Sequence, residues 1–393
     1  MLTKDEIEFI QNNLNQDIVK LILQQKRFPD LDIKKLANQI KARKKAIYKL
    51  PTLVQNKAVF FPPTIAWQQC SSEFTAKYKA SLVKGETAID LTGGFGIDTF
   101  YLAQCFEEIT YVEQQKKLSE IVAYNNKILQ QENIKVINED SIKTISKLDN
   151  VDLIYLDPAR RDENQRKVIS LEDSFPNIIE LQDELLHKSK SIMLKTSPML
   201  DIHQALRQLK NVEAIHIVAL ENECKELIFI QTKDLEKHIP IRLTCINIHR
   251  NGEKDIFETF YDNKEVIEYS LPQKYIYDPN KAVHKANVFN TFGNHFDLMK
   301  IAPNTHLYTS DVLMDNFQGR IFELESILKP SKKMLKNELS NGKANLIVRN
   351  FPETVASLKK KLKIQDGGNQ YLIAVSLENS DKVLLKCERI YFQ

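Results

Sequence analysis

Short apolar runs and longer segments of helical period alternate along the middle of the chain. Runs such as 87–91, 109–113 and 151–157 are bounded by turn residues, and segments with apolar residues three and four positions apart lie between them. This strand–helix alternation predicts a mostly parallel, doubly wound α/β sheet. The last two runs, AIHIVAL and ELIFIQ, are separated only by ENECK. We expect them to form an antiparallel hairpin at one edge of the sheet.

The two ends of the chain follow other patterns. Residues 1–80 have helical period, interrupted at Pro51 and at Pro62-Pro63. After the last hairpin the alternation stops, and we expect two strands around the Asn251-Gly252 turn that either extend the sheet or lead out of it. Residues 321–393 predict the order strand, helix, strand, helix, strand, strand.

The composition limits the class of protein. With 393 residues, 42% of them apolar and 27% charged, the chain is long enough for two to four globular domains. Its apolar runs are shorter than the ~18–20 residues that span a bilayer, and its first residues lack the apolar core of a signal peptide. The five cysteines lie far apart, which excludes a disulfide framework and a cysteine-based zinc site. We therefore expect a cytoplasmic multidomain protein without a metal site.

The net charge of +3 is distributed unevenly. Residues 1–85 carry +8, residues 86–320 carry −10, and residues 321–393 carry +5. Two basic flanks around an acidic centre suggest a polyanionic partner that is held at the ends of the chain. Lysine-rich helices that are simply solvated are the alternative, and charge by itself leaves it open.

Three of the ten glycines, Gly93, Gly94 and Gly96, follow the strand 87–91 directly. Glycine at this position allows a tight turn and the close approach of a ligand to the backbone, and the next helix points its N-terminal N–H groups to the same place. The following strand ends in Glu113, and a carboxylate there suits the two hydroxyls of a ribose. The combination indicates a nucleoside-containing cofactor.

The next strand ends distinguish between two cofactors. A dinucleotide fingerprint requires a third small residue where this chain has Thr99, which disfavours a dinucleotide. The run IKVINED brings Asp140 to a position from which a carboxylate could reach the amine of an adenine. The fourth strand ends in Asp157-Pro158, at the crevice of such a sheet.

These segments resemble a known family. AIDLTGGFGID, YVE, NED and LDPARR are similar to motifs I to IV of class I S-adenosylmethionine-dependent methyltransferases, over about residues 85–235. The glycine loop and YLDP look most like those of bacterial rRNA guanine-N2 methyltransferases. The whole layout resembles a bacterial group with a C-terminal THUMP-like RNA-binding module preceded by a small ferredoxin-like domain.

The resemblance implies a seven-stranded Rossmann-like methyltransferase core and a set of domains. We expect an N-terminal helical region at 1–83, the methyltransferase core at 84–275, the ferredoxin-like domain at 276–320 and the THUMP-like domain at 321–393. Lysine-rich helices in the last domain would neutralise phosphates without reading sequence. The expected partner is therefore RNA, either tRNA or rRNA.

The resemblance also implies roles for individual residues. The S-adenosylmethionine site would consist of Asp90, Thr92, Gly93, Gly94, Gly96, Glu113, Asp140 and Ser141. Asp90 and the glycine backbone would hold the methionine part, Glu113 the ribose, and Asp140 with Ser141 the adenine.

Asp157 and Pro158 match the first two residues of the family's Asp-Pro-Pro-aromatic motif. A carboxylate and a backbone carbonyl there would accept the protons of an exocyclic amine such as guanine N2, which localises the nitrogen lone pair for attack on the methyl group. The aromatic residue is replaced, and Arg160 and Arg161 could instead stack on the base or bind its phosphate. An ordinary solvated loop is the alternative for both arginines.

Three further interpretations differ in chemistry. C5 methylation of a pyrimidine needs a thiolate, and the sequence places no cysteine beside Pro158. An enzyme of the same fold could act on a protein or a small molecule, and a non-catalytic RNA-binding protein could retain a vestigial cofactor pocket. For Asp98 and Lys195, near strand ends, a structural salt bridge and a role in the site are both open.

Overall fold

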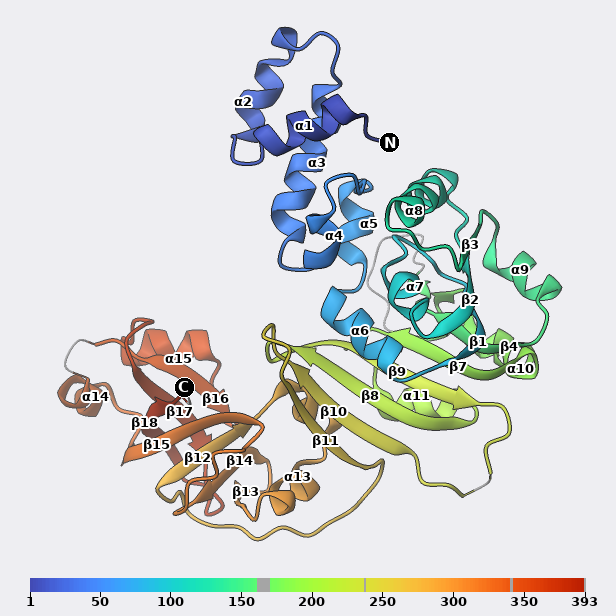
Figure 1. Ribbon diagram of the computed structural model, residues 1–393. Helices are drawn as coiled ribbons and strands as arrows, with labels where there is room; N and C mark the ends of the chain where they lie inside the picture. Colours follow the sequence, from blue (N-terminus) through green and yellow to red (C-terminus); the bar gives the residue numbers. More distant parts are fainter. Residues whose placement is uncertain (161–169, 237, 340–341, 392–393) are drawn as a thin grey trace. The chain divides into compact units, whose positions relative to one another are not determined.

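The computed structural model describes residues 1–160, 170–236, 238–339 and 342–391 (Figure 1). Contacts within the chain divide it into two compact units. The first contains residues 1–216, 225–241 and 250–252, and the second contains residues 217–224, 242–249 and 253–393. No helix among the described residues combines the length and the apolar character that a membrane span needs.

A nine-stranded sheet has the order β11-β10-β8-β9-β7-β4-β1-β2-β3. Its strands are β1 (Gly85–Asp90), β2 (Phe106–Val112), β3 (Ile134–Ile137), β4 (Val151–Leu156), β7 (Ser189–Thr196), β8 (Val212–Leu220), β9 (Glu223–Thr232), β10 (Arg242–Ile248) and β11 (Lys254–Phe260). Strands β3, β2, β1, β4 and β7 run parallel, whereas β9 pairs antiparallel with β7. The predicted doubly wound α/β fold class is confirmed.

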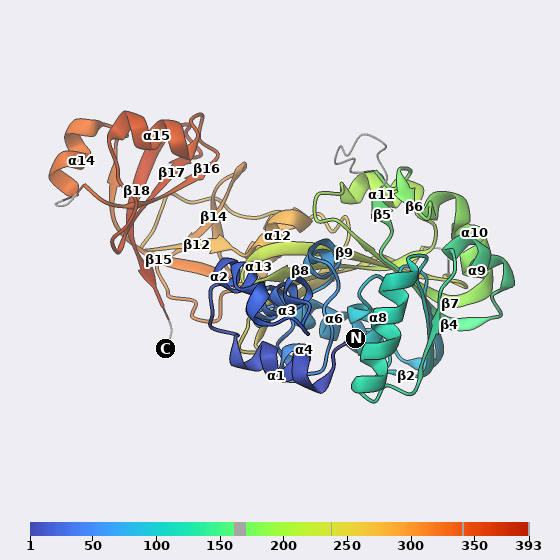
Figure 2. The ribbon, with the colours of Figure 1, turned by 90° about the horizontal axis from the view of Figure 1, so that it is seen from above.

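The helices between these strands are α7 (Ile97–Leu102), α8 (Lys116–Ile128), α9 (Ser141–Lys147), α10 (Ile178–Lys188) and α11 (Ile202–Gln208), and α6 (Glu73–Ser81) precedes β1. In Figure 2, α6 and α8 lie on one side of the sheet and α10 and α11 on the other. The parallel strands are therefore covered on both faces, as their apolar sequences require.

The hairpin of β8 and β9 does not form the edge of the sheet as we expected from the sequence. Strand β9 lies between β7 and β8, and β10 and β11 continue the sheet beyond β8. The physical reason lies in β8, where Ile215 and the residues 217–219 are fully buried. A strand that is apolar on both faces needs a neighbour at its open edge.

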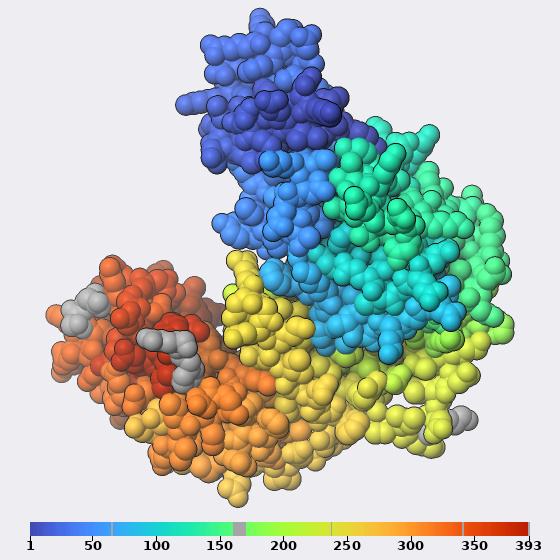
Figure 3. Space-filling model, in the orientation of Figure 1, coloured from blue at the N-terminus to red at the C-terminus, as the bar shows by residue number. Residues whose placement is uncertain are grey.

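The N-terminal helices are α1 (Lys4–Asn12), α2 (Ile18–Leu23), the 3-10 helix η1 (Gln25–Arg27), α3 (Ile33–Ala46), α4 (Pro51–Gln55) and α5 (Thr64–Gln69). Their residues form a separate lobe of the first unit in the space-filling view (Figure 3). The segment 56–61 joins this lobe to α8. Gln39 of α3 exchanges two hydrogen bonds with the backbone of Phe61, and Asn125 of α8 does the same with Phe60.

The second unit contains a seven-stranded sheet with the order β13-β14-β12-β15-β18-β17-β16. The elements are β12 (Tyr275–Pro279), α12 (Lys281–Ala286), α13 (Phe289–His295), β13 (Met299–Ala302), β14 (Thr305–Ser310), β15 (Gly319–Leu328), α14 (Lys332–Glu338), β16 (Asn345–Arg349), α15 (Val355–Leu362), β17 (Gln370–Ser376) and β18 (Lys382–Ile390). From β15 onward they follow the predicted order of strands and helices.

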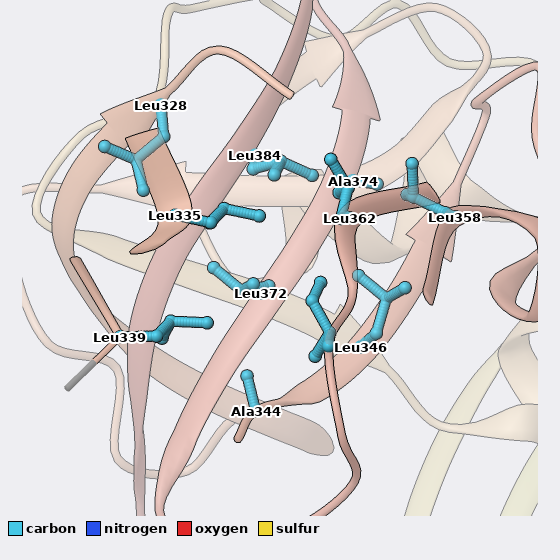
Figure 4. Packing of buried hydrophobic residues seen from close by; sticks show 11 residues of the cluster. Leu328, Leu335, Leu339, Ala344, Leu346, Leu358, Leu362, Leu372, Ala374 and Leu384 are labelled. Atoms are coloured by element: carbon cyan, nitrogen blue, oxygen red, sulfur yellow. The ribbon is translucent and has the colours of Figure 1, made fainter. Parts of the chain in front are cut away.

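Two apolar clusters cover the two faces of this sheet. Figure 4 shows the cluster beneath α14 and α15, in which Leu335 and Leu358 pack over Leu372 and Leu384. The next residues along the strands, such as Ile373, belong to the cluster on the other face. This alternation is the period of two that a sheet covered on both faces requires.

Candidate active site

The carboxyl ends of four parallel strands meet at one edge of the nine-stranded sheet. Asp90, the last residue of β1, lies beside Tyr111 of β2 and Tyr155 of β4 in the strand register. Strand β3 ends at the same edge. The N–H of Glu113, the residue that follows β2, donates to the carbonyl of Ile137, the last residue of β3, at 3.1 Å. The predicted site residues that follow β1, β2 and β4 therefore lie at one edge of the sheet.

The glycine loop after β1 has a fixed shape. The Gly93 N–H donates to the Val112 carbonyl (2.9 Å), and the Tyr111 hydroxyl donates to the Gly94 carbonyl (2.6 Å). A Cβ at Gly93 would lie 2.1 Å from the Tyr111 ring, so this position requires glycine for packing. Gly94 has a φ of +54°, and the nearest atom to a Cβ there would be 3.8 Å away. The backbone of Gly94 therefore borders open space. At Gly96, φ is +73° and Val122 lies against the position of a Cβ.

Asp90 stabilises the glycine loop through hydrogen bonds to the residues on both sides of it. Its carboxylate accepts hydrogen bonds from the Thr92 N–H (2.9 Å), the Thr92 hydroxyl (3.3 Å) and the Thr99 hydroxyl (2.6 Å). Asp90 is only 1% exposed, and burial raises the pKa of its carboxyl to about 7. The side chain thus contacts the loop itself, and its contact with the methionine part of a cofactor stays a prediction. Thr99, which we used only to disfavour a dinucleotide, is one of its partners.

Thr92 connects the loop to the end of β4. Its hydroxyl donates to Asp90 and accepts a hydrogen bond from the Asp157 N–H at 2.7 Å. One threonine therefore sets the position of the residue predicted to be catalytic relative to the residues predicted to bind the cofactor.

Glu113 lies directly against the glycine loop. Its carboxylate accepts from the Gly94 N–H (3.1 Å) and the Gln115 N–H (2.8 Å), and the side chain is partly exposed. Since a carboxylate offers about four lone-pair sites, Glu113 can accept further hydrogen bonds from a ligand. Asn138 was missed by the sequence analysis, although its amide donates to the Glu113 carbonyl (2.7 Å) and holds this strand end in place.

Asp140 and Ser141 begin α9 after β3. The Asp140 carboxylate accepts hydrogen bonds from the N–H groups of Ile142 and Lys143, which makes it the N-cap of the helix. Ser141 is buried in the first turn. The structure shows a capping role for Asp140 that the sequence analysis did not foresee, and contact with an adenine stays a prediction for both residues.

Asp157 and Pro158 follow β4 and are both partly exposed. The Asp157 side chain is 37% exposed and forms an ion pair with Lys195 of β7. The backbone of Ala159–Arg160 forms the short strand β5, which pairs with β6 (Ser174–Phe175). The side chain of Arg160 and the whole of Arg161 lie outside the described residues.

A group of charged side chains is buried behind this ion pair. The Lys79 ammonium of α6 lies 2.6 Å from the Glu226 carboxylate of β9 and 3.1 Å from Asp98 of α7. Asp98 also accepts from the hydroxyls of Ser71 (2.7 Å) and Tyr155 (2.8 Å). Burial raises the pKa of Asp98, but Lys79 and Lys195 outweigh burial, and the net shift is downward. Lys79 and Glu226 were missed, although Glu226 was visible as one charge within an apolar strand.

The C-terminal elements match two family models. Residues 275–317 match a ferredoxin-like domain, and residues 319–389 match the THUMP domain-like model. The chain carries a THUMP-like domain. This part of the resemblance is confirmed. The two matched ranges lie side by side in one sheet, because β12 pairs with β15, so the strands of the THUMP-like domain and those of the ferredoxin-like domain form a single sheet.

Comparison with solved structures extends the similarity beyond the THUMP-like domain. A candidate methyltransferase from Porphyromonas gingivalis W83 is 28% identical, with a TM-score of 0.86 and 100% of both chains covered. An rRNA methylase from Streptococcus thermophilus covers 40% of this chain and 93% of its own (13% identity, TM-score 0.31). TrmK from M. capricolum, in complex with S-adenosylhomocysteine, covers 42% and 71% (12% identity, TM-score 0.33). A search of curated proteins gives no match.

Proposed function

We propose that the protein transfers a methyl group from S-adenosylmethionine to RNA, at an exocyclic amine of a base such as guanine N2. The observation that carries the proposal is the shared sheet edge, at which Gly94, with room beside its Cα, and the carboxylate of Glu113 follow strands β1 and β2, and the partly exposed carboxylate of Asp157 follows β4. The similarity to the P. gingivalis methyltransferase candidate over the full length supports it.

The residues at this edge fit the cofactor. The open space at Gly94 admits a ligand to the loop backbone, and Glu113 retains capacity to accept from two ribose hydroxyls. In this proposal the backbone of 93–96 holds the methionine part and Asp140 with Ser141 faces the adenine. The bound cofactor supplies an electrophilic methyl group on a sulfonium.

Asp157 and the Pro158 carbonyl would orient the acceptor. An exocyclic amine is a poor nucleophile because its lone pair is delocalised into the base. Hydrogen bonds from its two protons to a carboxylate and a carbonyl localise that pair toward the methyl carbon. Cys70 lies close enough to Asp157 for the two to interact electrostatically, but burial raises the pKa of its thiol to about 11. The protonated thiol does not suit the alternative attack on a pyrimidine ring.

The RNA surface in this proposal is formed by the lysines of α14 and α15. Lys332, Lys333, Lys336 and Lys360 are exposed. Lys363 lies so close to Lys332 that it lowers the pKa of the Lys332 ammonium. Lys336 acts on Lys332 in the same way, and like charges that lie this close together suit the phosphates of an RNA backbone.

The test is methyl transfer to total RNA from a strain that lacks the gene, with tritiated cofactor, followed by mass spectrometry of the nucleosides. We expect label in a base-methylated nucleoside. Label in protein or in small molecules, with none in RNA, would contradict the proposal. Replacing Lys336 and Lys360 by glutamine should reduce the salt dependence of RNA binding by roughly one unit of log–log slope for each phosphate that a lysine no longer neutralises.

A further inference from the structure

Lys195 is the last residue but one of β7, and its ammonium is largely removed from water, which costs free energy unless the charge is paired. Its side chain is only 11% exposed, and its ammonium bonds to one oxygen of Asp157. Burial lowers the pKa of Lys195, but the carboxylates of Asp157, Asp98 and Glu226 outweigh burial and raise it. The lysine is therefore a fixed positive charge directly behind the carboxylate that faces the open edge.

The second buried lysine explains why Lys195 is directed to Asp157. Lys79 has no exposed surface and contacts both Glu226 and Asp98, with Ser71 as a further partner (3.0 Å). These contacts give Glu226 and Asp98 a cation of their own. In the ion pairs of this cluster Lys79 takes Asp98 and Glu226 and Lys195 takes Asp157, and of these three carboxylates Asp157 remains the most exposed to solvent.

We infer that Lys195 is a positioning residue that acts through Asp157: it fixes one carboxylate oxygen so that the other faces the acceptor. This inference rests on the proposed function. A carboxylate with one oxygen held in an ion pair loses the rotation that would turn its second oxygen away. The backbone of Asp157 is fixed independently by the Thr92 hydroxyl, so the ammonium controls the remaining freedom of the side chain.

The chemical step needs this orientation. The acceptor nitrogen forms a bond to the methyl carbon, the bond from that carbon to sulfur breaks, and its electron pair stays on sulfur. One proton of the nitrogen then leaves through the Asp157 carboxylate to water. Because reacting atoms must be aligned before the bond forms, a displacement of about 1 Å in the carboxylate can cost ~10²-fold in rate.

The experiment is a double-mutant cycle in the full-length protein, with single-turnover methylation of the identified RNA at saturating cofactor. Lys195→Gln should lower the rate ~10²-fold and leave the cofactor dissociation constant unchanged. In the Asp157→Asn background the same change should have no further effect, because its target is already altered. Lys195→Arg should recover part of the loss.

Lys190→Gln is the matched control. Lys190 lies in the same strand and also pairs with an aspartate of the β4 strand, Asp152, at 2.6 Å, but it is 83% exposed and lies at the opposite end. The Lys190→Gln variant should methylate RNA at the wild-type rate. A wild-type rate in Lys195→Gln would overturn the inference. So would a loss that adds in full to that of Asp157→Asn, because a structural role is independent of Asp157.

Two outcomes separate this inference from the proposed function. If the wild-type protein transfers no methyl group to RNA, the proposed function fails. If the wild type is active and the cycle is additive, only the role of Lys195 fails. Should Lys195→Gln be unfolded by circular dichroism, Lys195→Arg takes its place in the cycle, where a reduced rate that is absent in the Asp157→Asn background supports the inference and an additive loss overturns it.

Discussion

Among the described residues, each unit contains an ionic network centred on an aspartate, and the two networks around Asp157 and Asp278 are built in opposite ways. In the first unit, Lys195 pairs with Asp157, whose side chain is 37% exposed. In the second, Asp278 of β12 is 2% exposed and accepts hydrogen bonds from both guanidinium groups of Arg320 and Arg349. His284 lies 3.3 Å from the same carboxylate.

The two carboxylates differ in how many of their oxygen atoms already have a cationic partner. Asp278 has cationic partners on both oxygens, and although burial raises its pKa, these partners outweigh burial and hold it well below the usual range. Such a carboxylate connects strands and has little capacity for a ligand. Asp157 has one cation and an exposed side, which is the arrangement expected of a group that must accept a hydrogen bond from a substrate. We therefore propose that burial and the number of cationic partners separate the structural ion pairs of Asp278 from the ion pair of a candidate catalytic carboxylate, Asp157.

The largest effect should come from Asp157. Asp157→Asn removes the charge and replaces one acceptor oxygen by an NH₂ group, so we expect single-turnover methylation to fall by ~10²–10⁴-fold. The cofactor dissociation constant, measured by calorimetry, should change little. Near-wild-type turnover would assign Asp157 to the same structural class as Asp278.

Asp278→Asn should act on stability instead. It leaves two partly buried guanidinium groups without a counter-charge, and removing one partner of a buried ion pair typically costs ~3–5 kcal/mol. We expect faster hydrogen exchange in β12, β15 and β16, with methyl transfer by the first unit retained. Asp315→Asn, at an exposed position of the same unit, is the control. Unchanged exchange in those three strands would refute the structural assignment.

Asp90 is a third case. Its carboxylate is buried, and its hydrogen-bond partners are neutral rather than cationic. Burial raises its pKa to about 7 from 3.8, so the folded protein binds the proton more tightly than the unfolded chain. This contribution to stability is complete below pH ~4 and is lost as the pH rises through about 7, with a gradient of at most ~1.4 kcal/mol per pH unit.

Asp90→Asn should flatten that gradient. Urea unfolding between pH 4 and 8, followed by the fluorescence of Trp67 in the first unit, measures it. An identical pH dependence in the variant would show that Asp90 does not carry the extra proton.

Glu113 should give the smallest effect. Its partners in the protein are backbone N–H groups, so Glu113→Ala leaves no unpaired cation behind. We expect cofactor affinity to fall by at least ~10–100-fold, since the loss of one charge-assisted hydrogen bond, at ~1.5–3 kcal/mol, already has that effect. Calorimetry with S-adenosylmethionine tests this, and wild-type affinity would contradict the assignment of the ribose site.

The sequence allowed prediction of those parts of the site that depend on local order. Gly93, Gly94 and Glu113 were found because consecutive parallel strands bring their carboxyl ends to one edge, so spacing along the chain predicts proximity. The ion pair of Lys79 and Glu226 joins α6 to β9 over a long separation, and only the packing of helix on sheet creates it. The role of Thr99 was hidden for a different reason, because a threonine in a helix has no pattern that reveals its hydrogen-bond partner.

In the fold, too, the features set by local sequence order could be predicted, and those set by long-range packing could not. Strand and helix order in 321–393 could be predicted from local period, whereas the addition of β10 and β11 to the large sheet depends on burial of the outer face of β8. The networks around Asp157 and Asp278 both required the folded structure, since each combines residues from at least three elements.

The single sheet of the second unit means that its ferredoxin-like and THUMP-like parts depend on each other. The boundary between them, at residues 317–319, falls between β14 and β15, yet β15 pairs with β12 along five residues and Asp278 binds arginines on the far side of that boundary. A gene that lacked either part would encode a bare strand edge and an unmatched buried charge. The two families should therefore be gained, deleted and transplanted as one block, and a chimaera designed to move this block to another enzyme should be joined before Tyr275.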